Sequence, residues 1–326
     1  MLESEFLFGY DTHRLVLRST PAAVAGRVRV LSVDAAEGVI TGATLARLEA
    51  SLRKQSGDPD ARVADFFDLA AGSGSGKGIL GSLLCRSGGL LRRVFGSTTL
   101  RDTLKPADGY DFRMEEVCAA TCAGPAAAEV RSVDGRTMIR AVGGRLAMGN
   151  PTAAAVTHVL NNRHEFPTAG GVEDLLVVSI GGAEAPAPHG KARALLSAAE
   201  LVRIASSAHA DVVDQAMATA FGECRATNYV RIQGNEAVPG TTTAAAAGEG
   251  MLSERGVESV LFRERKLSEQ TNGEKLDLLA AELIKEQERR KQSTVPAVAT
   301  KTSATPFRSS SSTFTTTASA ATSASS

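Results

Sequence analysis

The stretch AAGSGSGKGIL, residues 70–80, holds the residues of this 326-residue chain whose types and spacing could do chemistry. One interpretation is a phosphate-binding loop, which needs a small residue, four variable positions, Gly-Lys and then a Ser or Thr that ligates Mg²⁺. Ala71 to Lys77 fits that spacing, but the next residue is Gly78. The metal ligand is therefore missing. The sequence also shows no second strand ending in an Asp that would help to hold Mg²⁺ in such a site.

A second interpretation is a nucleophile elbow, in which small residues flank a serine on a sharp turn between a strand and a helix. In the frame Gly72-Ser73-Gly74-Ser75-Gly76 the central residue is Gly74, so the hydroxyls flank the apex instead of occupying it. A third is a structural glycine bend whose following helix could still attract an anion through its N-terminal N–H groups. The local sequence leaves all three open.

Other reactive residue types are scattered. The four cysteines lack CxxC spacing, and we interpret them as reduced thiols in a reducing compartment. The histidines suggest no triad. Asp134 precedes Gly135 in a dipeptide typical of a tight hairpin turn, so we interpret it as a turn residue rather than a base. We expect no metal and no cofactor.

Charge and hydropathy limit the partners. Lys plus Arg and Asp plus Glu both number 36, so a net charge of zero offers no basic surface to nucleic acid. Residues 1–20 contain acids and no uninterrupted apolar core, which argues against a secretory signal. No apolar run approaches the roughly 20 residues of a membrane span. We expect a cytoplasmic protein with at most peripheral membrane contact, and the sequence names no protein partner.

Strand and helix patterns alternate along most of the chain, which predicts a mostly parallel sheet covered by helices on both faces. The apolar patterns predict strands over 27–34, 64–72 and 173–182 and helices over 44–55, 78–95 and 191–221. A hairpin is predicted from 127–133 and 137–142, and a helix with Asn150 as N-cap and Pro151 at its first position.

The C-terminal part differs in composition. Residues 240–250 are Thr, Ala and Gly except for Glu249 and predict a loop, whereas residues 272–292 predict a helix whose single apolar stripe docks on the body. After Ser293 the chain is rich in Ser, Thr and Ala and is predicted to be disordered. The expected divisions are an N-terminal lead (1–26), an α/β domain (27–240), a loop with a C-terminal amphipathic helix (241–292) and a tail (293–326).

Several segments together resemble the patatin-like phospholipases, and within them the plant class whose elbow reads G-x-G-x-G. The matching segments are RVLSVD, ARVADFFDLAAGSGSG, YDFRMEEVCAATCAG, GNPTAAAVTHVLNN, VEDLLVVSIGG and EKLDLLAAELIKEQERRK. They follow the family's order over most of residues 27–292. The resemblance implies a three-layer α/β/α fold and a Ser-Asp dyad that hydrolyses ester bonds of phospholipids and galactolipids.

Carried onto this sequence, the resemblance places both members of the dyad at altered positions. The nucleophile maps to Gly74, and the base of a D-G-G motif maps to Val142. Ser73 and Ser75 are weak substitutes, because a hydroxyl one position from the apex points elsewhere. The glycines that remain are Gly72 and Gly76 at the elbow and Gly143 and Gly144 of the D-G-G motif.

The oxyanion loop implied by the resemblance maps to DAAEG. Asp34 matches and Gly38 remains, but Ala35 and Ala36 replace glycines and resist positive φ. The chain is also far shorter between the elbow helix and YDFRMEE than in family members, so we expect a fold shortened in the middle. Two functions follow: a lipid acyl hydrolase by descent that is inactive or strongly impaired, or a noncatalytic lipid-binding or regulatory module. Both imply transient contact with membrane lipids.

Overall fold

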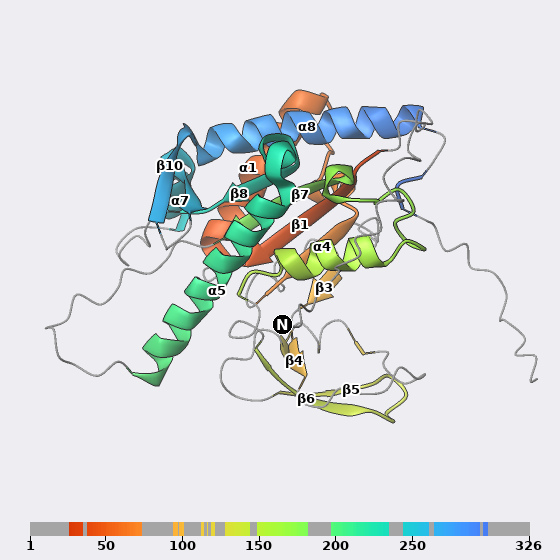
Figure 1. Ribbon diagram of the computed structural model, residues 1–326, viewed down its shortest axis with the longest axis vertical. Coiled ribbons are helices and arrows are strands. Elements are labelled where there is room, and N and C mark those ends of the chain that lie inside the picture. The colour runs from red at the N-terminus through yellow and green to blue at the C-terminus, as the bar shows by residue number, and fades with distance from the viewer. Residues whose placement is uncertain are drawn as a thin grey trace, which may run out of the picture.

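Figure 1 shows a computed structural model of the chain. The structure describes residues 26–34, 38–73, 94–96, 98–100, 112–113, 116, 119–120, 128–143, 149–181, 197–234, 244–260, 264–293 and 296–298. The expected lead before residue 26 and the expected tail after residue 298 lie outside the described residues.

A five-stranded sheet forms the centre of the molecule, and every strand runs parallel to its neighbours. In spatial order the strands are β3 (Val94–Gly96), β2 (Leu69–Gly72), β1 (Val28–Asp34), β7 (Leu175–Gly181) and β8 (Tyr229–Ile232). Nearly all residues of β1 and β7 are buried, as is typical of strands covered on both faces. The predicted parallel sheet is confirmed.

The side chains of β1 alternate between two apolar cores, because successive residues of a strand point to opposite faces of the sheet. Leu31 and Val33 join the core on one face, and Val28 and Val30 join the core on the other. The first face is covered by α1 (Gly38–Ser56), α7 (Ala244–Ser253) and α8 (Asn272–Gln292), and the second by α4 (Thr152–Asn161) and α5 (Ala198–Phe221) (Figure 1). The predicted three-layer α/β/α fold is confirmed.

Helix α8 docks on the body as predicted. Its N-cap residue Thr271 accepts a hydrogen bond from the Glu274 N–H, which fixes where the helix begins. Its apolar stripe packs into the core beside α1, and each buried leucine contributes about 1.5–3 kcal/mol. The buried leucines of the two helices are Leu45, Leu48 and Leu52 in α1 and Leu276, Leu279 and Leu283 in α8.

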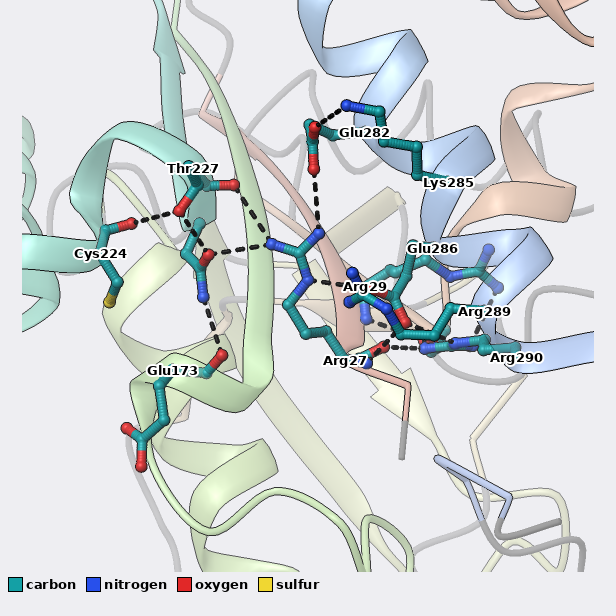
Figure 2. Close-up of polar contacts among 12 residues, drawn as sticks. Arg27, Arg29, Glu173, Cys224, Thr227, Glu282, Lys285, Glu286, Arg289 and Arg290 are labelled. Atoms are coloured by element: carbon teal, nitrogen blue, oxygen red, sulfur yellow. Dashed lines mark hydrogen bonds and ion pairs between the residues drawn. The ribbon is translucent and has the colours of Figure 1, made fainter. Parts of the chain in front are cut away.

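A cluster of charges joins α8 to the beginning of β1 (Figure 2). The Glu286 carboxylate is fully buried and accepts hydrogen bonds from the backbone N–H of Arg27 at 2.7 Å and from its Nε at 3.0 Å. Nearby, Asp68 accepts hydrogen bonds from the Arg29 N–H and from Arg290 Nη1, both at 2.8 Å. The last long helix is thereby fastened to the first strand.

Among the described residues, two smaller sheets lie outside the central one. One is antiparallel, in the order β4 (Thr98–Leu100), β6 (Met138–Gly143) and β5 (Ala128–Arg131). It contains the predicted hairpin, and Gly135 in its turn has the expected positive φ of 71°. The other is a hairpin of β9 (Arg255–Val260) and β10 (Glu264–Thr271), which we did not predict. The short helices in the described ranges are η2 (Val63–Phe66), η3 (Val172–Asp174), η4 (Gly222–Cys224) and α6 (Arg225–Asn228).

Three predicted elements need correction. Residues 244–250 of the expected loop belong to α7, because its run of alanines has the highest helix propensity. Residues 94–95, expected to end a helix, belong to β3 and pair with β2. Only the last four residues of the expected strand 64–72 are strand, since η2 occupies residues 63–66.

The remaining differences are small. Helix α4 begins one residue later than predicted, with Pro151 as N-cap, although Asn150 Oδ1 does accept the Thr152 N–H at 3.0 Å. The helix expected over 191–221 begins only at Ala198, because Ser197 is its N-cap with extended backbone and accepts the Glu200 N–H. Three residues of the segment expected to be disordered, 296–298, lie on the body, where Ala297 and Val298 join the core beside α4.

Candidate functional site

The carboxyl ends of the central strands meet at one edge of the sheet, where open α/β sheets bind their ligands. The register pairs Asp34 of β1 with Gly181 of β7 and Val33 with Gly72 of β2. The predicted elbow and the predicted oxyanion loop both begin at this edge. The sheet therefore brings the starting points of the two predicted site segments together.

Ser73, the described hydroxyl of the glycine-rich turn, is buried and already bonded. Its N–H donates to the Val33 carbonyl at 3.0 Å, which extends the pairing of β2 with β1 by one residue. Its Oγ donates to the Gly149 carbonyl at 2.8 Å, and only 2% of the residue is exposed. A nucleophilic serine instead donates to a general base, such as a carboxylate or an imidazole. Ser73 therefore ties the turn to the segment before α4.

Asp34, the acid of the predicted oxyanion loop, is held by an arginine from β8. The Arg231 Nη1 and Nη2 atoms lie 2.9 and 2.8 Å from the two carboxylate oxygens, and the side chains are 5% and 4% exposed. Burial raises the pKa of Asp34, and Arg231 opposes that rise. Burial alone would lower the pKa of Arg231, but the carboxylates of Asp34 and Asp214 raise it instead. Because both of its carboxylate oxygens are bonded to Arg231, Asp34 is not free to act as a base.

Gly181 is required by the close approach of this arginine. A Cβ atom at residue 181 would lie 2.4 Å from Arg231 Nη2, closer than any real contact of this kind. The glycine that ends β7 thus leaves room for the guanidinium to cross from β8 to Asp34.

A chain of hydroxyl groups continues inward from the ion pair. Arg231 Nη1 donates to Ser179 Oγ at 2.6 Å, and the Thr152 hydroxyl oxygen lies 2.9 Å from Ser179 Oγ and 2.8 Å from Ser32 Oγ. Thr152 Oγ1 is also 2.6 Å from Asn150 Oδ1. These residues are buried and tie the start of α4 to β1 and β7. The network therefore holds the start of α4 and the carboxyl ends of β1 and β7 in place at the edge of the sheet where open α/β sheets bind their ligands.

The predicted base position lies on β6. Val142 pairs with Thr99 of β4 and Gly143 pairs with Thr98, so both belong to the antiparallel sheet. Asp134, in the preceding turn, accepts hydrogen bonds from Ser132 Oγ at 2.5 Å and from the Arg136 N–H at 3.1 Å. These hydrogen bonds lower the pKa of Asp134. It is a turn residue, as predicted.

Of the other predicted site residues, two glycines lie at the ends of described elements and six residues lie outside the described ranges. Gly72 ends β2, and Gly38 begins α1 instead of continuing a loop. The residues outside are Ala35, Ala36, Gly74, Ser75, Gly76 and Gly144.

Sequence reasoning missed Ser32, Ser179 and Arg231. A signal was present, because each is a polar residue inside a buried apolar strand, where polar groups need hydrogen-bond partners. None of the helices in the described ranges has both the length and the hydropathy to cross a membrane. The described residues also contain no group of three or more His, Cys, Asp or Glu side chains that could hold a metal ion.

Comparison with known proteins gives several relatives, although no protein-family model matches the chain. The chain is 43% identical over 376 residues to patatin-like protein 3 of Oryza sativa subsp. indica, and this match covers 90% of each of the two chains. It is 38% identical over 403 residues to patatin-like protein 7 of Arabidopsis thaliana, covering 93% of this chain and 83% of that one. It is 32% identical over 340 residues to the Arabidopsis thaliana protein named "Probable inactive patatin-like protein 9", covering 79% and 86%.

The matched region is longer in the relatives than in this chain. Ninety per cent of 326 residues is about 293, whereas the match to the Oryza sativa protein spans 376 residues, a difference of about 80. This difference agrees with the predicted shortening of the fold. With identities of this size over most of both chains, the chain belongs to the patatin-like protein family, whose type of function is lipid hydrolysis.

Proposed function

We propose that this chain descends from lipid acyl hydrolases and that its own hydrolytic activity is absent or strongly impaired. The proposal begins with the sequence, in which glycine and valine stand where the family resemblance places the nucleophile and the base. Removing the nucleophile of a serine hydrolase costs roughly 10⁶-fold in turnover. What remains comes from binding and from oxyanion donors, and here two alanines replace glycines of the donor loop.

The observation that carries the proposal is the hydrogen bond of Ser73. A displaced serine could replace the lost nucleophile only if its hydroxyl faced a base and a substrate. Ser73 Oγ instead donates to a backbone carbonyl at 2.8 Å in a buried position. Asp34, an acid at the same edge of the sheet, is held by Arg231. A relative that is 32% identical and bears the name "Probable inactive patatin-like protein 9" adds support.

A hydrolysis assay tests the proposal directly. We expect purified protein to release acid from nitrophenyl butyrate and from phosphatidylcholine no faster than heat-denatured protein does. We also expect no covalent labelling by a fluorophosphonate probe. Labelling at Ser73 or Ser75, lost in Ser73→Ala or Ser75→Ala, would contradict the proposal.

A restored variant separates lost groups from a lost cleft. Gly74→Ser with Val142→Asp returns both members of the implied dyad. Hydrolysis by the double variant, with none by either single variant, would mean that the missing groups limit activity. No hydrolysis by a folded double variant would mean that the shortened body no longer holds a substrate.

We propose in addition that the protein acts in the cytoplasm and contacts membrane lipids transiently. The balanced net charge supports weak binding that does not depend on anionic lipid. Sedimentation with phosphatidylcholine vesicles tests this contact. Vesicles that also contain an anionic lipid are the comparison. Binding only to the anionic vesicles, or no binding to either kind, would contradict the proposed lipid contact and would favour a regulatory module that binds proteins.

A further inference from the structure

A cavity of about 520 Å³ lies along β8, the edge strand of the central sheet. Its walls come from η4 and α6, from the β9–β10 hairpin and from α8. The volume is within the range of small-molecule sites, about 300–1,000 Å³. Arg231 lines it too, but its guanidinium is already held by Asp34.

Two cations in this cavity share one carboxylate at long range. Arg225 Nη2 lies 3.5 Å and Lys275 Nζ 3.9 Å from the oxygens of Glu258. Charge-assisted hydrogen bonds between such groups are normally about 2.7–2.9 Å long. A guanidinium carries five donors and an ammonium three. Glu258 therefore leaves most of these donors without a partner among the described residues.

The other acids that line the cavity do not neutralise this pair. Glu282 accepts from Arg27 at 3.3 Å and from Lys285 at 2.8 Å, and Glu223 is exposed. The Lys275 side chain is only 12% exposed, so its charge is held away from bulk water. Burial lowers the pKa of Lys275, and the nearby charge of Arg225 adds to that shift, whereas the carboxylates of Glu258 and, to a smaller extent, Asp214 oppose it. An anion placed between Arg225 and Lys275 would offset the cost of burying the Lys275 charge and the repulsion between the two cations.

An apolar surface adjoins the two cations. Leu278 lines the cavity although it is 54% exposed, and Val230 and Leu279 lie in the wall. A leucine exposed to this extent beside a cavity offers a surface to an apolar ligand group. The cavity thus combines an anion-binding pair with a hydrophobic wall.

We propose that this cavity binds an amphiphilic anion, with a carboxylate or phosphate head between Arg225 and Lys275 and an acyl chain along Leu278 and Val230. A free fatty acid and a lysophospholipid share this chemistry. The site shares the wall residue Arg231 with the carboxyl-edge network, but its proposed anion-binding pair, Arg225 and Lys275, lies outside that network, and binding there does not require the protein to hydrolyse esters. Its occupancy can therefore be measured whether or not the proposed function holds.

Calorimetric titration of the full chain tests the site with four probes: decanoate, decanoyl lysophosphatidate, inorganic phosphate and 1-decanol. We expect saturable binding of decanoate or of the lysophosphatidate, the tighter of the two identifying the head group. Lys275→Gln and Arg225→Gln should each weaken that binding by about 10- to 100-fold, because each removes a charged donor. Lys291→Gln is the matched control, since this lysine of the same helix pairs with Glu288 and its side chain is 66% exposed.

Equal affinity in Lys275→Gln, Arg225→Gln and the control would overturn the proposal. So would decanol binding as tightly as decanoate, or phosphate binding as tightly as the lysophosphatidate. A second measurement uses the unaltered protein, in case a variant fails to fold. Decanoate or the lysophosphatidate should slow acetylation of Lys275 by acetic anhydride, relative to Lys291, as read by peptide mass spectrometry. Equal protection of both lysines would also overturn it.

Discussion

Arg231 at the carboxyl end of β8 reaches across β7 to hold both carboxylate oxygens of Asp34 on β1, at 2.9 and 2.8 Å. Since the two side chains are 5% and 4% exposed, removing the arginine leaves a buried charge without its partner. Such a loss typically costs about 3–5 kcal/mol. We expect Arg231→Met to lower the free energy of unfolding by that amount in urea titrations. Arg136→Met, at a side chain 80% exposed, should change it by less than about 0.5 kcal/mol.

The same ion pair makes Gly181→Ala costly. The new methyl group would lie 2.4 Å from Arg231 Nη2 and would push the guanidinium away from Asp34. Overpacking of this kind costs about 1–3 kcal/mol. In the Arg231→Met background, Gly181→Ala should lower the free energy of unfolding much less. A double-mutant cycle therefore measures the coupling between residues 181 and 231. Gly42→Ala is the control, because its Cβ would meet nothing within 4 Å in α1; additive effects of the two substitutions would contradict the assignment.

Glu286→Gln tests the attachment of α8. The substitution keeps the shape of the side chain but removes the charge that faces Arg27 and Arg289, at 3.0 and 2.8 Å. Because the carboxylate is fully buried, we expect a loss of about 3 kcal/mol in the free energy of unfolding. Glu288→Gln, whose side chain is 58% exposed, should fall within about 1 kcal/mol of the unaltered protein. Similar losses in both variants would show that the cluster does not fasten the helix.

Asp68 should make the protein sensitive to acid. Burial alone would raise the pKa of Asp68, but the hydrogen bond from Arg290 and the charges of Arg29 and Arg290 hold it below its ordinary value of 3.8. The stabilisation is therefore complete above the pKa of the unfolded chain and is lost as the pH falls through the lower pKa of the folded state. Below about pH 4, the free energy of unfolding should fall more steeply in the unaltered protein than in Asp68→Asn. Urea titrations between pH 7 and pH 3 measure both slopes, and equal slopes would exclude this role.

Periodicity along the chain predicted the layers of the fold, because strands and helices leave repeats that can be read within a few residues. The stripe of α8 and the Asp134-Gly135 turn are of this kind. The ion pair of Asp34 with Arg231 spans 197 residues, and its existence depends on the order in which the strands assemble. No local pattern contains that order.

Short polar side chains inside apolar strands were the feature of the sequence that indicated a buried hydrogen-bond network at the carboxyl edge. Ser32 and Ser179 interrupt otherwise apolar runs, and each turned out to face Thr152. The sequence shows that such residues need partners but not which ones. The assignments of Gly74 as nucleophile position and Val142 as base position depend on the family's motifs and stay predictions.

The bonds between Arg27 and Glu286 join residues 259 positions apart. During synthesis the first strand leaves the ribosome long before the helix that neutralises its arginine exists. A nascent chain therefore holds uncompensated charge at the edge of an incomplete core until α8 has been synthesised. A premature stop codon ahead of that helix should yield a polypeptide that chaperones retain and proteases degrade.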